Sequence, residues 1–287
     1  MEKLSLPRGR FLSLEPFAVM GIVNATPDSF HAASRHQARD AARDAALAMI
    51  AEGADVIDVG GESTRPGSSY IDESEELGRV IPAIEAIRRE SDIPISVDTR
   101  KAAVWKAALE AGADILNDIS ALRDSPALAP LAAAAGAPVI LMHMKGEPAT
   151  MQNAPYYDDC LGEVSRFLLD AAARAEAAGL PREAIVLDPG IGFGKRNEDN
   201  LALLSGLSSL RDLGYPLLVG LSRKGFIGAL TGKPIEERLA GSLGAAAAAW
   251  CRGARLFRVH DVAQTRDLLL LVSTILAPRQ SAASAGD

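Results

Sequence analysis

Eight short apolar runs recur along the chain, and a longer segment with helical spacing follows each of them. The runs are rich in valine, isoleucine and leucine and do not alternate with polar residues, which is typical of strands buried on both faces in a parallel sheet. They span residues 18–23, 55–59, 94–97, 113–116, 137–142, 184–187, 216–221 and 254–259.

The intervening segments place apolar residues on one helical face. In residues 37–53, Ala38, Ala42, Ala46 and Met49 share a face, and Gly53 supplies the stop. The same reasoning predicts helices over residues 73–90, 101–111, 126–135, 159–178, 197–213, 235–250 and 262–276. Strict alternation predicts an α/β fold, a (β/α)8 TIM barrel, and the alternative is an open doubly wound sheet.

No linker or change in composition divides the chain, so we expect a single domain. Residues 1–17 are expected to form a short N-terminal hairpin that plugs the bottom of the barrel. Residues 18–277 are expected to form the barrel, and residues 278–287 a flexible tail of small residues.

Charge and composition weigh against several classes of partner. The net charge is -7 and no long basic run occurs, so we expect no nucleic-acid partner. The N-terminal segment lacks the apolar centre of a signal peptide, and no run reaches the roughly 18 apolar residues of a membrane span, so we expect no membrane partner and a cytoplasmic location. Cys160 and Cys251 are expected to be reduced packing residues.

Polar side chains follow the predicted strands, where a barrel places its working face. Asp98, Asn117 and Asp188 offer carboxylates and an amide that can pair with a flat array of N–H donors, such as a 2-amino-4-oxo-pyrimidine edge. A second, cationic and polar group suits phosphate oxygens. Its members are Asn24, Arg65, Arg258 and His260.

Other motifs narrow the chemistry. None of the four histidines is paired at i+3 or i+4 with another ligand, which argues against a histidine-based zinc site and favours Mg2+ held by oxygen ligands and substrate phosphates. The stretch DPGIGFGK is not a P-loop, because Pro189 stands where a glycine is needed and Arg196 replaces serine or threonine. We interpret it as a glycine turn against a flat ligand, with Phe193 stacking on that ligand. His143 follows a strand and is either a satisfied core histidine or a member of the site.

With these residues in place, the sequence resembles the dihydropteroate synthase family of the pterin-binding barrel superfamily. The resemblance covers about residues 20–262. The matching segments are GIVNATPDSF, GADVIDVGGESTRPG, PISVDT, GADILNDIS, LMHMKGEPATMQ, DPGIGFGK, GLSRKGFIG, ERLAGS and RVHDV. The resemblance implies a transferase of folate synthesis that condenses 6-hydroxymethyl-7,8-dihydropterin pyrophosphate with 4-aminobenzoate, and a target of sulfonamides.

The resemblance also implies a role for particular residues. Asn24 would bind Mg2+ and act in catalysis with Lys224, Arg258 and His260. The pterin site would consist of Asp98, Asn117, Ile119, Met142, Asp188, Phe193, Gly220 and Lys224. The pyrophosphate and aminobenzoate sites would consist of Phe30, Thr64, Arg65, Pro66, Ser222, Gly225, Arg258 and His260. Phe30 would belong to a first mobile loop, and residues 64–66 to a second.

Two departures from the family pattern bear on these roles. Gly225 replaces a serine that often follows the lysine of the SRK turn, so the affinity for aminobenzoate or sulfonamides is expected to differ somewhat. The first loop reads His31-Ala32-Ala33-Ser34 where relatives usually continue Ser-Asp-Gly-Gly.

The partners and two alternative functions also follow from the resemblance. It suggests a homodimer, with which the small-residue segment 241–249 is compatible. A pterin-dependent methyltransferase, which would need a cobalamin-carrying partner, and a non-catalytic pterin-binding paralogue stay as alternatives.

Overall fold

The computed structural model describes residues 3–25, 32–63, 67–68 and 70–277. Within them, eight parallel strands form one sheet in the order β8-β7-β6-β5-β4-β3-β10-β9. A parallel bridge between Leu187 and Leu217 brings β8 to the segment before β9 and completes the ring. The predicted (β/α)8 barrel is therefore confirmed, and the alternative of an open doubly wound sheet is not.

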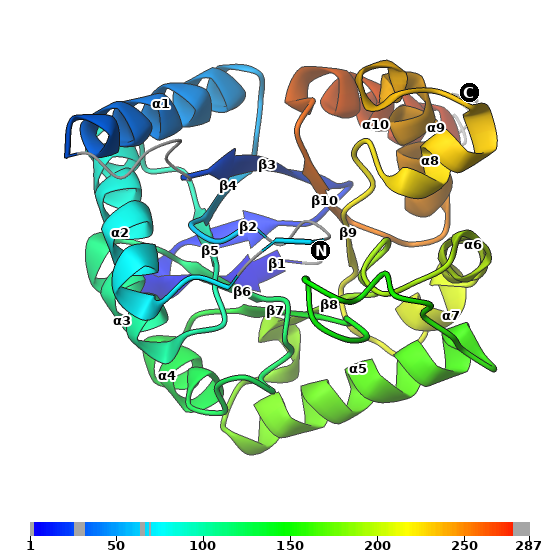
Figure 1. Cartoon of the computed structure of the whole chain (residues 1–287), viewed down its shortest axis with the longest axis horizontal. Helices are drawn as coiled ribbons and strands as arrows, with labels where there is room; N and C mark the ends of the chain where they lie inside the picture. The colour runs from blue at the N-terminus through cyan, green and yellow to red at the C-terminus, as the bar shows by residue number, and fades with distance from the viewer. Residues whose placement is uncertain (1–2, 26–31, 64–66, 69, 278–287) are drawn as a thin grey trace, which may run out of the picture.

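Figure 1 shows the strands surrounded by the helices. The strands are β3 (Ala18–Asn24), β4 (Val56–Gly60), β5 (Ile95–Asp98), β6 (Ile115–Asp118), β7 (Val139–Met142), β8 (Ile185–Asp188), β9 (Leu218–Val219) and β10 (Leu256–Val259). The helices are α1 (Ala32–Ala51), α2 (Glu73–Glu90), α3 (Ala102–Ala111), α4 (Leu128–Ala135), α5 (Cys160–Ala177), α6 (Asn197–Ser205), α7 (Leu207–Arg211), α8 (Gly225–Thr231), α9 (Leu239–Cys251) and α10 (Val262–Leu276).

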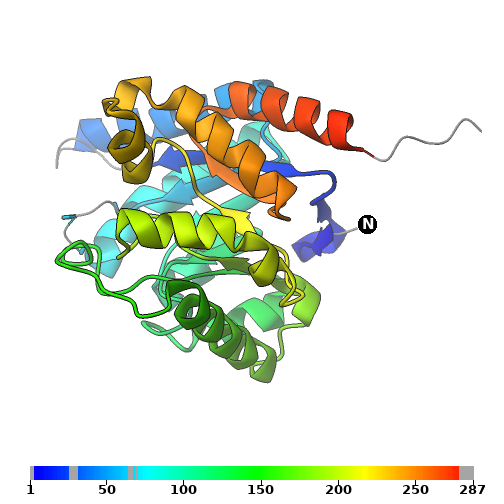
Figure 2. The same cartoon turned by 90° about the vertical axis from the view of Figure 1, so that its right-hand side faces the viewer.

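The strands are mainly apolar because each one is buried on two sides. Successive side chains of a strand point to opposite faces, so Val19 packs toward the helices while Met20 packs inside the barrel. The inner core also contains Leu4 and Leu12 from the N-terminal hairpin, whose strands are β1 (Lys3–Ser5) and β2 (Phe11–Ser13). Figure 2 shows this hairpin at the end of the barrel opposite the long loop that follows β7. The predicted hairpin plug is thus present.

Several element boundaries differ from the sequence prediction. The predicted helix over 197–213 divides at Gly206 into α6 and α7, and α5 packs so closely there that a Cβ at Gly206 would lie 2.5 Å from the Leu161 side chain. The predicted helix over 235–250 divides into a 3-10 turn, η3 (Ile235–Glu237), and α9. Strand β9 has only two residues, Leu218–Val219, where the sequence predicted a run over 216–221.

The two cysteines do not share one environment. Cys160 is buried at the start of α5, as expected of a packing residue, and burial raises the pKa of its thiol to about 11. Cys251 ends α9 and is exposed, so the prediction that it is a packing residue is wrong. Both are free thiols.

Within the described ranges, we find no helix that has both the length and the apolar character required to span a membrane.

Candidate active site

A cavity of about 880 Å3 opens at the carboxyl ends of the strands. Every strand of the barrel ends at its wall, because parallel strands that close into a ring bring all their carboxyl ends to one face. Thirteen of the predicted site residues line this one cavity. They are Asn24, Asp98, Asn117, Ile119, Met142, Asp188, Phe193, Gly220, Ser222, Lys224, Gly225, Arg258 and His260. The other four, Phe30, Thr64, Arg65 and Pro66, lie outside the described residues.

The floor of the cavity is a cluster of charged groups. Arg258 Nε donates to Asp58 Oδ2 over 2.6 Å, and its Nη2 donates to Asp98 Oδ2 over 3.0 Å. Asn117 Nδ2 donates to both oxygens of Asp58, over 3.3 and 3.4 Å. The sequence placed Arg258 with the phosphate-binding group, whereas its guanidinium lies against the carboxylates of the floor.

Asp58 is a member of this floor that the sequence analysis missed. It lies inside the apolar run of β4 and is fully buried. A carboxylate buried in such a run needs a buried partner, since an unpaired buried charge costs on the order of several kcal/mol of folding free energy. That requirement was the available signal, but the partner, Arg258, lies 200 residues further along the chain.

Burial sets the electrostatics of the floor. It raises the pKa of Asp98 to about 7, reinforced by the charge of Asp58 and opposed by Arg258. It also raises the pKa of Asp188, where the Gly190 N–H and the charge of Lys224 act in the opposite direction. These carboxylates are therefore short of stabilising donors, and a ligand that presents N–H groups to them would supply what they lack.

Apolar side chains and one lysine form the wall above the floor. Ile119, Met142 and Met151 form a buried cluster against which Phe193 packs. Lys224 Nζ lies 4.3 Å from the centre of the Phe193 ring, a cation–π contact. Burial lowers the pKa of Lys224 to about 8, and Asp188 opposes that shift. A polar floor with an apolar and aromatic wall suits a flat heterocycle with donors on one edge.

The rim is held by contacts between the segments that follow β9 and β10. His260 Nδ1 lies 3.1 Å from Ser222 Oγ. One residue further on in both segments, Arg223 Nη2 donates to Asp261 Oδ1 over 2.7 Å. Arg223 has a φ of 56°, in the left-handed region, and its backbone N–H donates to Ser242 Oγ over 2.8 Å. These contacts fix the turn that carries Lys224 beside the end of β10.

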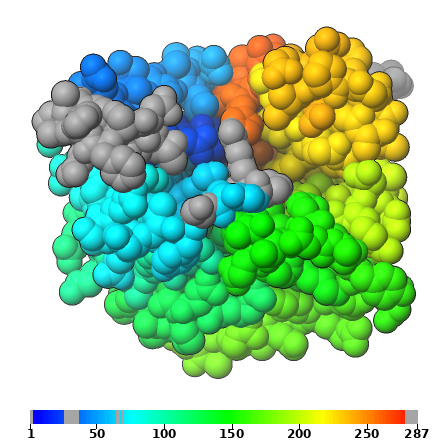
Figure 3. Space-filling model, in the orientation of Figure 1, coloured from blue at the N-terminus to red at the C-terminus, as the bar shows by residue number. Residues whose placement is uncertain are grey.

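Arg100 joins four of the loops around the mouth. Its guanidinium donates to Glu62 over 2.6 Å, to Asp124 over 2.7 Å and to Glu147 over 3.2 Å, in the segments after β4, β6 and β7. Figure 3 shows the segments after β4 (cyan) and β7 (green) side by side, where Gly67 N donates to the Pro148 carbonyl over 3.0 Å. Arg100 was not among the residues predicted to form the site.

The loop between β8 and α6 is a glycine turn, as predicted. Gly190 has a φ of +64°, and a Cβ there would lie 1.9 Å from the carbonyl oxygen of His143. A Cβ at Gly194, which has a φ of +61°, would lie 2.1 Å from the carbonyl oxygen of Lys145. Any other residue at either position would meet backbone at impossible distances, so the turn lies directly on the segment that follows β7. His143 itself is buried and hydrogen-bonded.

Comparisons with known proteins agree with this geometry. Residues 20–260 match the family model described as pterin binding enzyme. The chain is 46% identical to the dihydropteroate synthase of Escherichia coli (strain K12) over 96% of this chain and 97% of the relative.

Two solved structures are similar to the whole barrel. The Xanthomonas albilineans dihydropteroate synthase with 4-aminobenzoic acid is 47% identical with a TM-score of 0.89, covering 96% of this chain and 99% of that one. The same organism's enzyme in complex with 7,8-dihydropteroate is 43% identical with a TM-score of 0.85, covering 97% and 100%. The fold, the cavity and the family match define the class, a pterin-binding enzyme with a TIM barrel. Within that class, the chain belongs to the dihydropteroate synthase family, whose members are transferases.

Proposed function

We propose that this chain condenses 6-hydroxymethyl-7,8-dihydropterin pyrophosphate with 4-aminobenzoate, giving 7,8-dihydropteroate and pyrophosphate. The observation that carries the proposal is the floor of the cavity, where Asp98, Asn117 and Asp188 converge beneath the Phe193 ring and Lys224. The relatives solved with 4-aminobenzoic acid and with 7,8-dihydropteroate support both halves of the reaction.

The pterin ring would lie deep in the cavity. Its amino group and ring N–H donors would pair with the carboxylates of Asp98 and Asp188 and with the Asn117 amide oxygen. Phe193, Ile119, Met142 and Gly220 would line its faces, and Lys224 would donate a hydrogen bond to its acceptors. The raised pKa values of Asp98 and Asp188 support this pose, since donors from a ligand stabilise their charged forms.

The pyrophosphate would reach from Arg258 on the floor to His260 at the rim, and the family resemblance adds Thr64 to this group. The donor set fits a Mg2+ ion bound with the substrate, because the Asn24 side chain reaches the cavity from the end of β3. Among the described residues no three histidine, cysteine or acidic groups gather as a metal site, so substrate phosphates and waters would complete the coordination, as is usual for Mg2+. When bound, the ion supplies charge neutralisation for the departing pyrophosphate.

The chemistry then needs positioning more than a strong base. Cleavage of the C–O bond to pyrophosphate leaves a cation on the pterin methylene, which the electron-rich ring stabilises, and the aniline nitrogen attacks that carbon and then loses a proton. Arg258 and His260 would stabilise the charge that develops on pyrophosphate. The ordered cavity would hold the two reacting atoms together and exclude the water that competes for the cation.

A direct assay tests the proposal. Purified protein with both substrates and Mg2+ should release one pyrophosphate per 7,8-dihydropteroate formed, a metal chelator should stop turnover, and added Mg2+ should restore it. Folded protein that binds the pterin without turnover would favour the non-catalytic paralogue. Methyl transfer to a cobalamin-carrying partner would favour the methyltransferase.

Gly225 offers a test of the aminobenzoate pocket. It begins α8, and a Cβ built there meets no atom within 4 Å, so a serine side chain has room. We expect Gly225→Ser to lower the KM for 4-aminobenzoate by about fivefold, the value of one added hydrogen bond of about 1 kcal/mol. The KM for the pterin substrate should stay within twofold. Steady-state kinetics with each substrate varied in turn provide the measurement, and an unchanged aminobenzoate KM would place its carboxylate elsewhere.

We further propose that the protein is a homodimer located in the cytoplasm. Helix α10 leaves Leu270, Leu271, Ile275 and Leu276 between 55% and 68% exposed, an apolar surface that a second copy of the chain would cover. The free thiols of Cys160 and Cys251 agree with a reducing compartment.

A further inference from the structure

Lys195 is a buried cation for which the proposed reaction has no use. Its side chain is almost fully buried, and within the described part of the chain none of the partners of its Nζ is a carboxylate. Instead, Nζ contacts the carbonyl oxygens of Gly190 over 2.9 Å, Phe193 over 3.0 Å and His143 over 3.3 Å, and it lies 2.9 Å from His143 Nδ1.

This arrangement is costly, which argues for a role beyond packing. An ammonium group that contacts no carboxylate loses its hydration on burial, and that burial lowers the pKa of Lys195 to about 7 although the charges of Asp188 and Asp199 oppose the shift. Burial and the charge of Lys195 lower the pKa of His143 to about 2, so its imidazole is neutral and can accept through Nδ1. The two residues therefore form a matched donor and acceptor at the back of the glycine turn.

One contact leads through Gly190 to the floor of the cavity. The Gly190 carbonyl accepts from Lys195, and the Gly190 N–H donates to Asp188 Oδ1 over 2.7 Å. Because the Gly190 Cα lies against the His143 carbonyl, this residue cannot move toward β7. The orientation of the Gly190 backbone, held on both sides, thus sets the direction of the Asp188 carboxylate.

A second contact leads through Phe193 to the wall. The Phe193 carbonyl accepts from Lys195 over 3.0 Å, while its ring lies 4.3 Å from Lys224 Nζ. The same ammonium therefore holds the backbone of the residue whose ring forms the aromatic wall. Two other carbonyls of the turn are held by side chains on the β7 segment, Gly192 by Gln152 and Gly194 by Tyr157, each over 2.8 Å.

We propose that Lys195 is a positioning residue that sets the glycine turn so that Asp188 and Phe193 are preorganised for the pterin ring. The proposal rests on the pterin site proposed above. It concerns only one substrate, because the contacts of Lys195 lead to the pterin end of the cavity and not to Gly225 or the rim. A residue that served packing alone would affect stability without distinguishing the two substrates.

The test is the kinetics of Lys195→Met, which keeps the length of the stem and removes all the donors. We expect the KM for the pterin substrate to rise by about 20-fold or more, comparable to the loss of one charged hydrogen bond, and the KM for 4-aminobenzoate to stay within twofold. Lys195→Gln, which restores two donors on a shorter stem, should recover part of the pterin affinity. Calorimetric binding of the pterin substrate should follow the same order.

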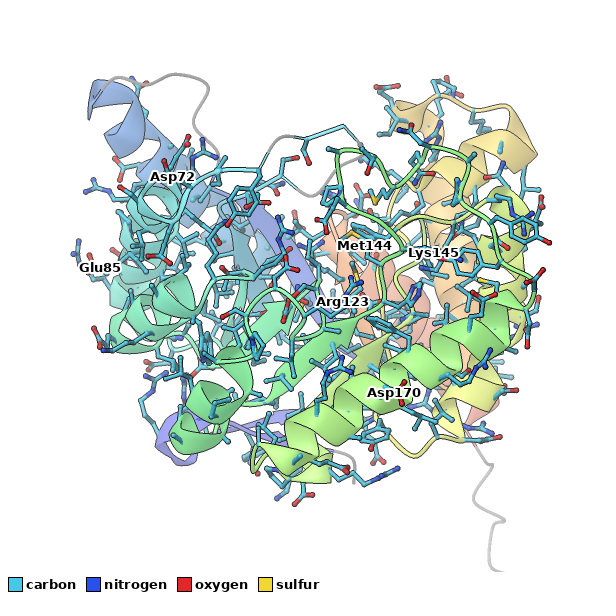
Figure 4. The ribbon with its side chains drawn as sticks, turned by 60° about the horizontal axis from the view of Figure 1, so that its bottom comes forward. Asp72, Glu85, Arg123, Met144, Lys145 and Asp170 are labelled. Carbon is cyan, nitrogen blue, oxygen red and sulfur yellow. The ribbon has the colours of Figure 1, made fainter. Side chains whose placement is uncertain are left out.

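Lys145→Met is the matched control. Lys145 also lies beside the turn, on the segment after β7 labelled in Figure 4, but its Nζ donates to the Tyr156 carbonyl and pairs with Glu163 instead of the glycine carbonyls. Both KM values of this variant should match the wild type. Wild-type protein without turnover would contradict the proposed function itself. If the wild type is active, a folded Lys195→Met whose two KM values are unchanged, or are raised by the same factor, would overturn the role of Lys195. If Lys195→Met does not fold, the same comparison of the two KM values in Lys195→Gln decides.

Discussion

Asp188→Asn is expected to weaken binding of the pterin substrate by at least about 100-fold, the equivalent of losing charged hydrogen bonds in a buried site. Asp188 is buried at the end of β8, where its Oδ1 already accepts from Gly190 N and its charge faces Lys224. An asparagine has the same shape, but its amide turns an N–H toward ring donors or toward Gly190. Two donors then face each other without an acceptor, which costs more than the lost attraction alone.

Calorimetry with the pterin substrate measures this loss directly, without any need for turnover. Asp170→Asn provides the control, since Asp170, labelled on α5 in Figure 4, is exposed and does not line the cavity, and the same change of charge there should leave affinity within twofold. Circular dichroism should show that both variants are folded. A dissociation constant for Asp188→Asn within tenfold of the wild type would contradict the assignment of Asp188 to the ring.

The floor of the cavity could be predicted from sequence for a geometric reason. Asp98, Asn117 and Asp188 each follow an apolar run, and a closed ring of parallel strands brings such positions together whatever the lengths of the helices between them. The same logic identified Lys224 and His260. It required only the period of the pattern, not the details of packing.

The residues that hold these groups in place could not be predicted from the positions of the apolar runs. Asp58 and Arg258 come from β4 and β10, which lie on either side of β3, and they pair because of strand order and stagger, which the apolar pattern does not encode. The glycines of DPGIGFGK predicted a tight turn, but nothing local shows that Lys195 folds back on its carbonyls. The two-residue β9 likewise depends on how the ring closes, since Leu187 bridges Leu217 before the strand begins.

The opposite end of the barrel depends on one carboxylate, Asp114. It precedes β6, is fully buried, and accepts from Arg88 over 2.9 Å, from Arg8 over 2.5 Å and from Arg10. Its Oδ2 also accepts from the backbone N–H of Ile95 over 3.0 Å. Two of these arginines belong to the hairpin turn, so Asp114 fastens the hairpin plug to the barrel.

We therefore expect Asp114→Ala to lower the free energy of unfolding by about 3–5 kcal/mol, because it leaves buried donors without an acceptor and positive charges without a partner. At about 2–4 °C per kcal/mol for a domain of this size, the melting temperature should fall by about 6–20 °C. Denaturant unfolding and a thermal melt provide the two measurements.

Arg8→Ala distinguishes the contribution of the Asp114 carboxylate from that of one of its arginine partners. The Arg8 side chain is 48% exposed, so its ion pair is worth about 1 kcal/mol or less, and the loss of stability should be correspondingly small. Because Asp114 lies at the hairpin end and the pterin cavity at the other, folded Asp114→Ala should bind the pterin substrate within twofold of the wild type. A melting temperature of Asp114→Ala within 2 °C of the wild type would contradict the expected loss of stability. It would show that the packing of Leu4 and Leu12 suffices to keep the hairpin plug at the bottom of the barrel without this cluster.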